Sequence, residues 1–268
     1  LDEIYKTVSL YFKVLTNEER VSALHSAIMY SFAMTRGIII EIDDYSTQLV
    51  RFNRRVVQNS ISLPYGMVNL LEKFRDKSFS ERMDSATDFM TKELKKIDWL
   101  YDLEEDCEFI GVGEVFLSLG KLSRKATHYP IDVAHNYEIT TESFNNVYHL
   151  IHGLDLDKAK KLKGISEKRA DLIAIGFAIA NAIYSQAVRT CMKVSVNGEM
   201  YGIVAKNILG QSSEKPLLDI LGYSLSSINE FYPTNINIDS NYAIAVILYK
   251  QLKVLHKLTR PYVKVLRI

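Results

Sequence analysis

Carboxylates recur in two stretches of the sequence where a polar turn follows an apolar run. Glu41, Asp43 and Asp44 lie at the end of the first run, and a fourth carboxylate follows the second run at Glu114. If the two turns meet, the four side chains form an oxygen-rich cluster of the kind that holds Mg²⁺ or Ca²⁺. The alternative, which we favour, is a solvated acidic turn without a ligand.

Other patterns in the sequence suggest further chemistry but less strongly. A zinc site could be built from four histidines that are close in sequence, His128, His135, His149 and His152. No cysteine or second motif completes a tetrahedral set, so we expect structural histidines. The basic run between Lys158 and Arg169 is mixed with acids, which favours a solvated helix face over a surface for an acidic partner. The motifs of serine hydrolases, zinc peptidases, Rossmann proteins and P-loop proteins do not occur.

The composition is that of an ordinary soluble globular protein. Lysine and arginine number 33 and aspartate and glutamate 32, so the formal charge of +1 gives no long-range attraction to nucleic acid or an anionic membrane. Two cysteines suit a reducing cytoplasm, and no apolar run reaches the roughly 18 residues of a membrane span. We therefore expect a cytoplasmic protein with no membrane or nucleic-acid partner. The chain opens at Leu1 rather than Met, which predicts a piece of a longer protein.

The elements that must position the acidic turns follow from the periodicity of apolar residues. The stretch Arg36 to Leu63 has three β-branched pulses separated by short polar breaks, which predicts a three-stranded antiparallel meander. Further strands are predicted at 107–112 and 190–196. Apolar residues at helical spacing predict helices at 1–34, 67–75, 81–101, 114–124, 140–153, 155–162, 166–186 and 199–209, with more in 213–268.

Set in order, these elements read β-β-β-α, α, β-α, a helical insertion and β-α. That is the order of an α/β, ribonuclease H-like domain of the actin-like superfamily, in which each β-α step extends the sheet by a right-handed crossover. We predict N-terminal helices over 1–34, the actin-type domain over 35–210 with its insertion at about 138–188, and a helical C-terminal extension over 211–268.

From about Gly37 to Gly202 the chain resembles the second domain of the exopolyphosphatase/pppGpp phosphohydrolase (Ppx/GppA) family. The segment Ser62–Val68, SLPYGMV, is similar to the family's S-L-P-L-G-A-V. The segment His128–Tyr137, HYPIDVAHNY, is similar to its H-Y-P-L-D-x-x-H-N-Y linker, and GISEKRADLI from Gly164 is similar to its G-L-S-x-E-R-A-D-x-I. Three collinear segments at family-like spacing are a specific signal.

The resemblance implies an actin-like pair of domains that grips phosphates between them, with Mg²⁺ as the cofactor if the protein is active. The family's D-I-G-G-G-S-T-E turn stands here as Glu41 to Gln48, which implies Glu41 as catalytic and Glu41 and Asp43 as metal ligands. The family's catalytic E-E pair corresponds to Asp2-Glu3, which adds Glu3. The implied phosphate ligands are Ser46, Thr47, Gly111, Gly113 and Gly198.

The same resemblance shows where this sequence departs from the family. Three glycines of the first turn have become Asp43, Asp44 and Tyr45, whose acids repel a polyanion. Glu114 follows the second glycine loop, at the start of a helix where phosphate would sit. We therefore expect a degenerate bacterial relative of enzymes that hydrolyse polyphosphate or pppGpp, weak or inactive in this form. The alternative is a pseudo-enzyme that serves as a binding or oligomerisation module, with 213–268 as the contact of a homodimer.

Overall fold

The computed structural model describes residues 2–187, 191–209, 238–258 and 260–263. The chain divides into two compact units, Leu1–Pro216 and Leu217–Ile268. The first unit contains the sheet and the acidic turns. The second contains α11 (Ile238–Gln251), α12 (Lys253–His256) and a 3₁₀ turn, η3 (Arg260–Val263). The predicted helices within 210–237 lie outside the described residues, and the predicted domain boundaries stay predictions.

A six-stranded sheet forms the centre of the first unit, in the order β3-β2-β1-β4-β6-β5. The strands are β1 (Arg36–Ile42), β2 (Thr47–Asn53), β3 (Val56–Leu63), β4 (Glu108–Val112), β5 (Glu138–Thr140) and β6 (Cys191–Ser195). Strands β1, β2 and β3 form the predicted antiparallel meander, β4 pairs in parallel with β1, and β6 pairs in parallel with β4. The acidic turns therefore lie together at the end of the sheet where the parallel strands β1 and β4 have their carboxyl ends.

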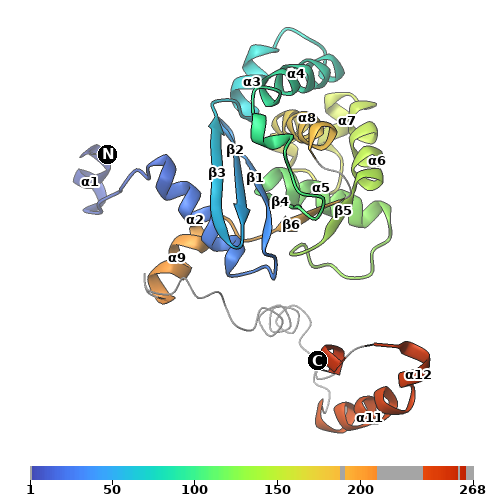
Figure 1. Ribbon diagram of the computed structural model, residues 1–268. Coiled ribbons are helices and arrows are strands. Elements are labelled where there is room, and N and C mark those ends of the chain that lie inside the picture. Colours follow the sequence, from blue (N-terminus) through green and yellow to red (C-terminus); the bar gives the residue numbers. More distant parts are fainter. Residues whose placement is uncertain (1, 188–190, 210–237, 259, 264–268) are drawn as a thin grey trace. The chain divides into compact units, whose positions relative to one another are not determined.

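Helices cover both faces of the sheet, because β1 is apolar on both. Ile38, Ile40 and Ile42 face one core, and Ile39 faces the other. The first core is shared with α3 (Met67–Lys73), α4 (Phe79–Leu94), α5 (Glu114–Ala126), α6 (Thr141–His152) and α8 (Ala170–Gln186). The opposite face is covered by α2 (Asn17–Met29), against which α9 (Glu199–Leu209) packs (Figure 1). By alternation, Glu41 shares the α2 face with Ile39.

Local differences from the predicted elements have physical reasons. The helical insertion was expected from 138, but Glu138–Thr140 is the edge strand β5, which pairs antiparallel with β6. Thr140 then caps α6, because its hydroxyl accepts the N–H of Ser143 at 3.1 Å. The predicted helix 81–101 ends at Leu94 and resumes as a 3₁₀ turn, η1 (Asp98–Leu100).

The remaining elements of the first unit are short. They are α1 (Asp2–Val8), α7 (Leu156–Lys160) and the 3₁₀ turn η2 (Glu167–Arg169). Residues 9–16 separate α1 from α2, so the predicted helical region 1–34 is two helices. No helix in the described part of the chain is long and apolar enough to cross a membrane.

Candidate functional site

The turn between β1 and β2 is hydrogen-bonded to the first residues of α3. The N–H of Met67 donates to the carbonyl of Asp43 at 3.0 Å, and the N–H of Val68 donates to that of Asp44 at 2.7 Å. Gly66 lies so close to the turn that a Cβ there would be 2.4 Å from the Asp43 carbonyl oxygen. The segment Ser62–Val68, one of the three that resemble the family, thus supports the turn.

The backbone of this turn does not need glycine. Among the described residues, the non-glycine residues with positive φ do not include any from Asp43 to Ser46. Two acids and an aromatic residue therefore fit where the family has glycines, without backbone strain. The turn keeps its place in the fold while its side chains change the chemistry.

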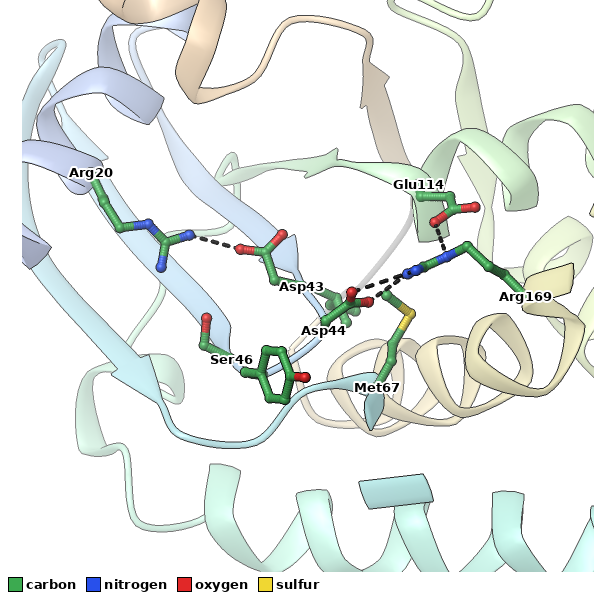
Figure 2. A pocket seen from close by; sticks show the side chains of 9 residues that line it. Arg20, Asp43, Asp44, Ser46, Met67, Glu114 and Arg169 are labelled. Carbon is green, nitrogen blue, oxygen red and sulfur yellow. Dashed lines mark hydrogen bonds and ion pairs between the residues drawn. The ribbon is translucent and has the colours of Figure 1, made fainter. Parts of the chain in front are cut away.

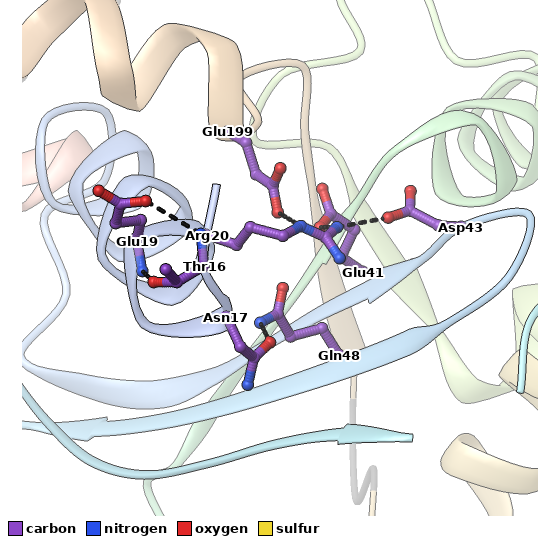
Figure 3. Close-up of polar contacts among 8 residues, drawn as sticks. All are labelled: Thr16, Asn17, Glu19, Arg20, Glu41, Asp43, Gln48 and Glu199. Atoms are coloured by element: carbon purple, nitrogen blue, oxygen red, sulfur yellow. Dashed lines mark hydrogen bonds and ion pairs between the residues drawn. The ribbon is translucent and has the colours of Figure 1, made fainter. Parts of the chain in front are cut away.

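Arg20 of α2 is bound by three carboxylates from three elements (Figure 3). Its Nη2 donates to Asp43 Oδ2 at 2.7 Å and lies 3.4 Å from Glu41 Oε2. Its Nε donates to Glu199 Oε1, on the first turn of α9, at 2.8 Å. Burial opposes the charge of Arg20, but Glu199, Asp43 and Glu41 together hold its pKa above the ordinary value. The positive charge of Arg20 is therefore already balanced by carboxylates of the same chain.

Glu41 is the most perturbed acid of the cluster. Its side chain is only 8 % exposed, and burial raises its pKa to about 8. Burial is the largest cause of this value; the neighbouring carboxylates Asp43 and Glu199 also raise the pKa, whereas Arg20 lowers it. The raised pKa favours the protonated form of the Glu41 carboxyl group, which can donate a hydrogen bond.

Arg169, at the end of η2, is occupied in the same way (Figure 2). Its Nη2 donates to Asp44, and its Nε lies 2.8 Å from Glu114 Oε2. The hydrogen bond to Asp44 is the main reason that its pKa is raised. Glu114 is the first residue of α5, directly after β4. The two acidic turns do come together, and Arg169 binds a carboxylate from each of them.

A pocket of about 460 Å³ lies between the two arginines. Its remaining lining comes from the turn, from α3 and from the start of α5, with the residues Ile42, Asp43, Asp44, Tyr45, Ser46, Met67 and Glu114. Asp43, Asp44 and Glu114 outnumber the two guanidinium groups, so the pocket carries excess negative charge.

The predicted metal ligands do not fit Mg²⁺ in this arrangement. Glu41 and Asp43 both face Arg20, which takes the place that a cation would need. Over the described ranges of the chain, no three or more His, Cys, Asp or Glu side chains gather as a metal site. The four histidines are dispersed too. His135 packs against Phe32, and His152 contacts Asp84 at 2.9 Å.

Several predicted phosphate ligands have structural tasks. Thr47 is fully buried, and its hydroxyl donates to the carbonyl of Tyr65 at 2.7 Å. At Gly111 a Cβ would lie 2.3 Å from the ring of Phe116, so no side chain fits. Gly113 begins α5 at φ +94°, where other residues are strained.

The other predicted ligands lie closer to the charged cluster. Ser46 lines the pocket. A Cβ at Gly198 would be 3.9 Å from Glu41 Oε1, so the third glycine loop borders the Arg20 cluster. Their binding of phosphate stays a prediction.

Sequence reasoning missed Arg20 and Glu199 as partners of the turn. Arg169 stood in a recognised segment, but its pairing with Asp44 spans 125 positions and has no local signature. Glu3, the predicted catalytic residue, lies in α1, and its side chain is outside the described part. A Glu-Glu pair, at 18–19, stands immediately before Arg20 in α2. That pair was the available signal that α2 leads into the site.

Comparison with known proteins gives this arrangement its context. A bifunctional 3-dehydroquinate synthase/phosphatase of Fusobacterium nucleatum is 24 % identical over 177 residues, which are 64 % of this chain and 26 % of that protein. The chain thus spans about a quarter of that relative's length.

Two solved structures are similar in fold to most of this chain. A Ppx/GppA family member of Aquifex aeolicus matches with a TM-score of 0.67 and 23 % identity, over 80 % of this chain and 70 % of that one. An exopolyphosphatase of Cytophaga hutchinsonii matches with a TM-score of 0.70 and 14 % identity, over 78 % and 69 %. These likenesses confirm the predicted actin-like fold. The sequence profile of the Ppx/GppA phosphatase family matches residues 1–209, and the chain therefore belongs to that family.

Proposed function

We propose that this chain is a degenerate Ppx/GppA domain, related to exopolyphosphatases and pppGpp phosphohydrolases, whose phosphate site is weak or inactive in this form. One observation carries the proposal: the arginines on both sides of the turn are bound by the chain's own carboxylates. Asp43 holds Arg20, and Asp44 holds Arg169. A phosphate group that enters the pocket would therefore compete with these carboxylates for both arginines.

The electrostatics support the same conclusion. A like-charge pair at about 4 Å costs about 1 kcal/mol even in water, and more in a partly buried pocket. A polyphosphate entering this pocket meets Asp43, Asp44 and Glu114, each 38–44 % exposed in its side chain. It must also displace one carboxylate from each arginine before it gains an ion pair. The repulsion by the carboxylates and the need to displace them from the arginines both oppose the binding of polyphosphate.

The finer parts of the proposal follow the family. Any residual turnover would be phosphoanhydride hydrolysis of polyphosphate or pppGpp with Mg²⁺ supplied in solution, in the bacterial cytoplasm. The near-zero net charge supports the absence of a nucleic-acid or membrane partner.

A binding or oligomerisation module is the second candidate function, and α11 favours it. Its side chains Ile244, Ile247 and Leu248 follow helical spacing and are 48–57 % exposed. A stripe of this kind fits a homodimer contact. Sedimentation equilibrium tests it: the chain should be a dimer, and Ile247→Glu should be a monomer. A wild-type monomer at all concentrations would remove this candidate.

Phosphate release tests the main proposal. The chain is incubated with polyphosphate and with pppGpp in the presence of Mg²⁺, and Glu41→Ala serves as the background. We expect no release above that background, or slow release that Asp43→Gly/Asp44→Gly increases. Rapid release that Glu41→Ala abolishes would contradict the proposal.

A further inference from the structure

The guanidinium group of Arg20 joins two parts of the first unit, the helix α9 and the turn between β1 and β2. Its Nε donates to Glu199 of α9, and its Nη2 donates to Asp43 of the turn (Figure 3). The guanidinium is planar and rigid, so its donors cannot move independently. A displacement of either carboxylate must weaken one of two charge-assisted hydrogen bonds or carry the other carboxylate with it.

The helix α9 packs very closely on α2. A Cβ at Gly202 would lie 1.8 Å from the carbonyl oxygen of Ala23, so the two backbones are almost in contact. A second polar contact joins the helices farther along, where Lys206 Nζ donates to Ser22 Oγ at 2.6 Å. A shift of α9 is therefore felt directly along α2, which carries Arg20.

The helix α9 lies where the first unit continues into the rest of the chain. It is the last described element of the first unit in sequence, so the chain leads from α9 towards residues 217–268. The turn, at the other end of the contact, lines the pocket. Arg20 therefore contacts both α9, the helix after which the chain continues towards residues 217–268, and the turn that lines the pocket.

We propose that Arg20 is a clasp that couples the position of α9 to the conformation of the turn Asp43–Ser46. When α9 is in place, Glu199 fixes one edge of the guanidinium and its other edge holds Asp43. When α9 shifts, Arg20 withdraws and the turn loses that support. The coupling goes beyond the proposed function and holds whether or not the domain releases phosphate.

Hydrogen exchange of the turn tests the clasp. The amide protons of Met67 and Val68 report on it, since they are bonded to the carbonyls of Asp43 and Asp44. In Glu199→Gln we expect both to exchange about tenfold faster than in the wild type, which lies within the usual range of coupling between sites.

Lys206→Met is the matched control. It removes the hydrogen bond from Lys206 to Ser22, which joins α9 to α2 away from the turn. The exchange of Met67 and Val68 should stay at the wild-type rate. Unchanged exchange in Glu199→Gln, or equal acceleration in Lys206→Met, would overturn the proposal.

Arg20→Lys extends the test and replaces it if Glu199→Gln loses the fold. Lysine keeps the positive charge but lacks the two-edged fork. We expect the same acceleration in Arg20→Lys, and no further acceleration when Glu199→Gln is added. An additive effect of the two substitutions would show that Glu199 does not act through Arg20.

Discussion

Glu41→Gln should remove a pH dependence of stability that the wild-type protein has. Burial raises the pKa of Glu41 from 4.5 to about 8, so between these values the folded protein holds a proton that the unfolded chain has lost. Stability contributed in this way is present at low pH and is lost as the pH rises towards 8. Glutamine copies the neutral, hydrogen-bonding form and has no proton to lose.

The magnitude follows from the width of that window. One pH unit of differential protonation is worth about 1.4 kcal/mol. His25 complicates the acid side, because burial lowers its pKa from 6.5 to about 4 and stability then falls as the pH drops below 6.5. The unfolded chain loses the rest of this proton above pH 6.5, and because His25 is present in both proteins its contribution cancels when the wild type is compared with Glu41→Gln. Between pH 6.5 and 8.5 the loss from Glu41 alone is therefore about 2 kcal/mol.

Urea denaturation from pH 6.5 to 8.5 measures this loss. The unfolding free energy of the wild type should fall by about 2 kcal/mol more than that of Glu41→Gln over this range. Glu114→Gln is the control, because Glu114 is 41 % exposed and bound to Arg169 rather than Arg20. Its curve should run parallel to that of the wild type. Parallel curves for wild type and Glu41→Gln would refute the reasoning.

Three further substitutions test the scaffold of the site. Gly113→Ala should lower the unfolding free energy by about 1–3 kcal/mol in urea melts, since φ is +94° there; a neutral effect would contradict that strain. Gly202→Ala should destabilise by about 1–3 kcal/mol and disturb α9 packing, because its Cβ would meet the Ala23 carbonyl; wild-type stability would show that the helices separate freely. Thr47→Val should cost about 1 kcal/mol in urea melts through its lost hydrogen bond to Tyr65; unchanged stability would contradict that structural role.

The fold was predictable because its signals are local. The β-branched pulses of 36–63 and the two later strands, each leading into a helix, specify the order of the elements. The crossover rule then fits the parallel position of β4 beside β1 and of β6 beside β4. The short strand β5 was missed because three residues carry no period. Its extended form depends on pairing with β6.

The acidic turn was predictable from the sequence, but its neutralisation was not. Asp43 and Asp44 are visible as departures from a glycine-rich motif, and repulsion of phosphate follows from their charge. Their partners lie 23 and 125 positions away, on α2 and η2. No spacing rule connects them, because the packing of helices on the sheet decides which arginine reaches the turn.

Binding of inorganic triphosphate, measured by calorimetry, tests the central claim most directly. We expect no binding by the wild type, because Asp43 and Asp44 occupy Arg20 and Arg169. Asp43→Asn/Asp44→Asn keeps the shape of the turn and removes both charges, so it should bind triphosphate, and Arg169→Gln in that background should abolish the binding. Equal affinity of the wild type and the double variant would contradict the account.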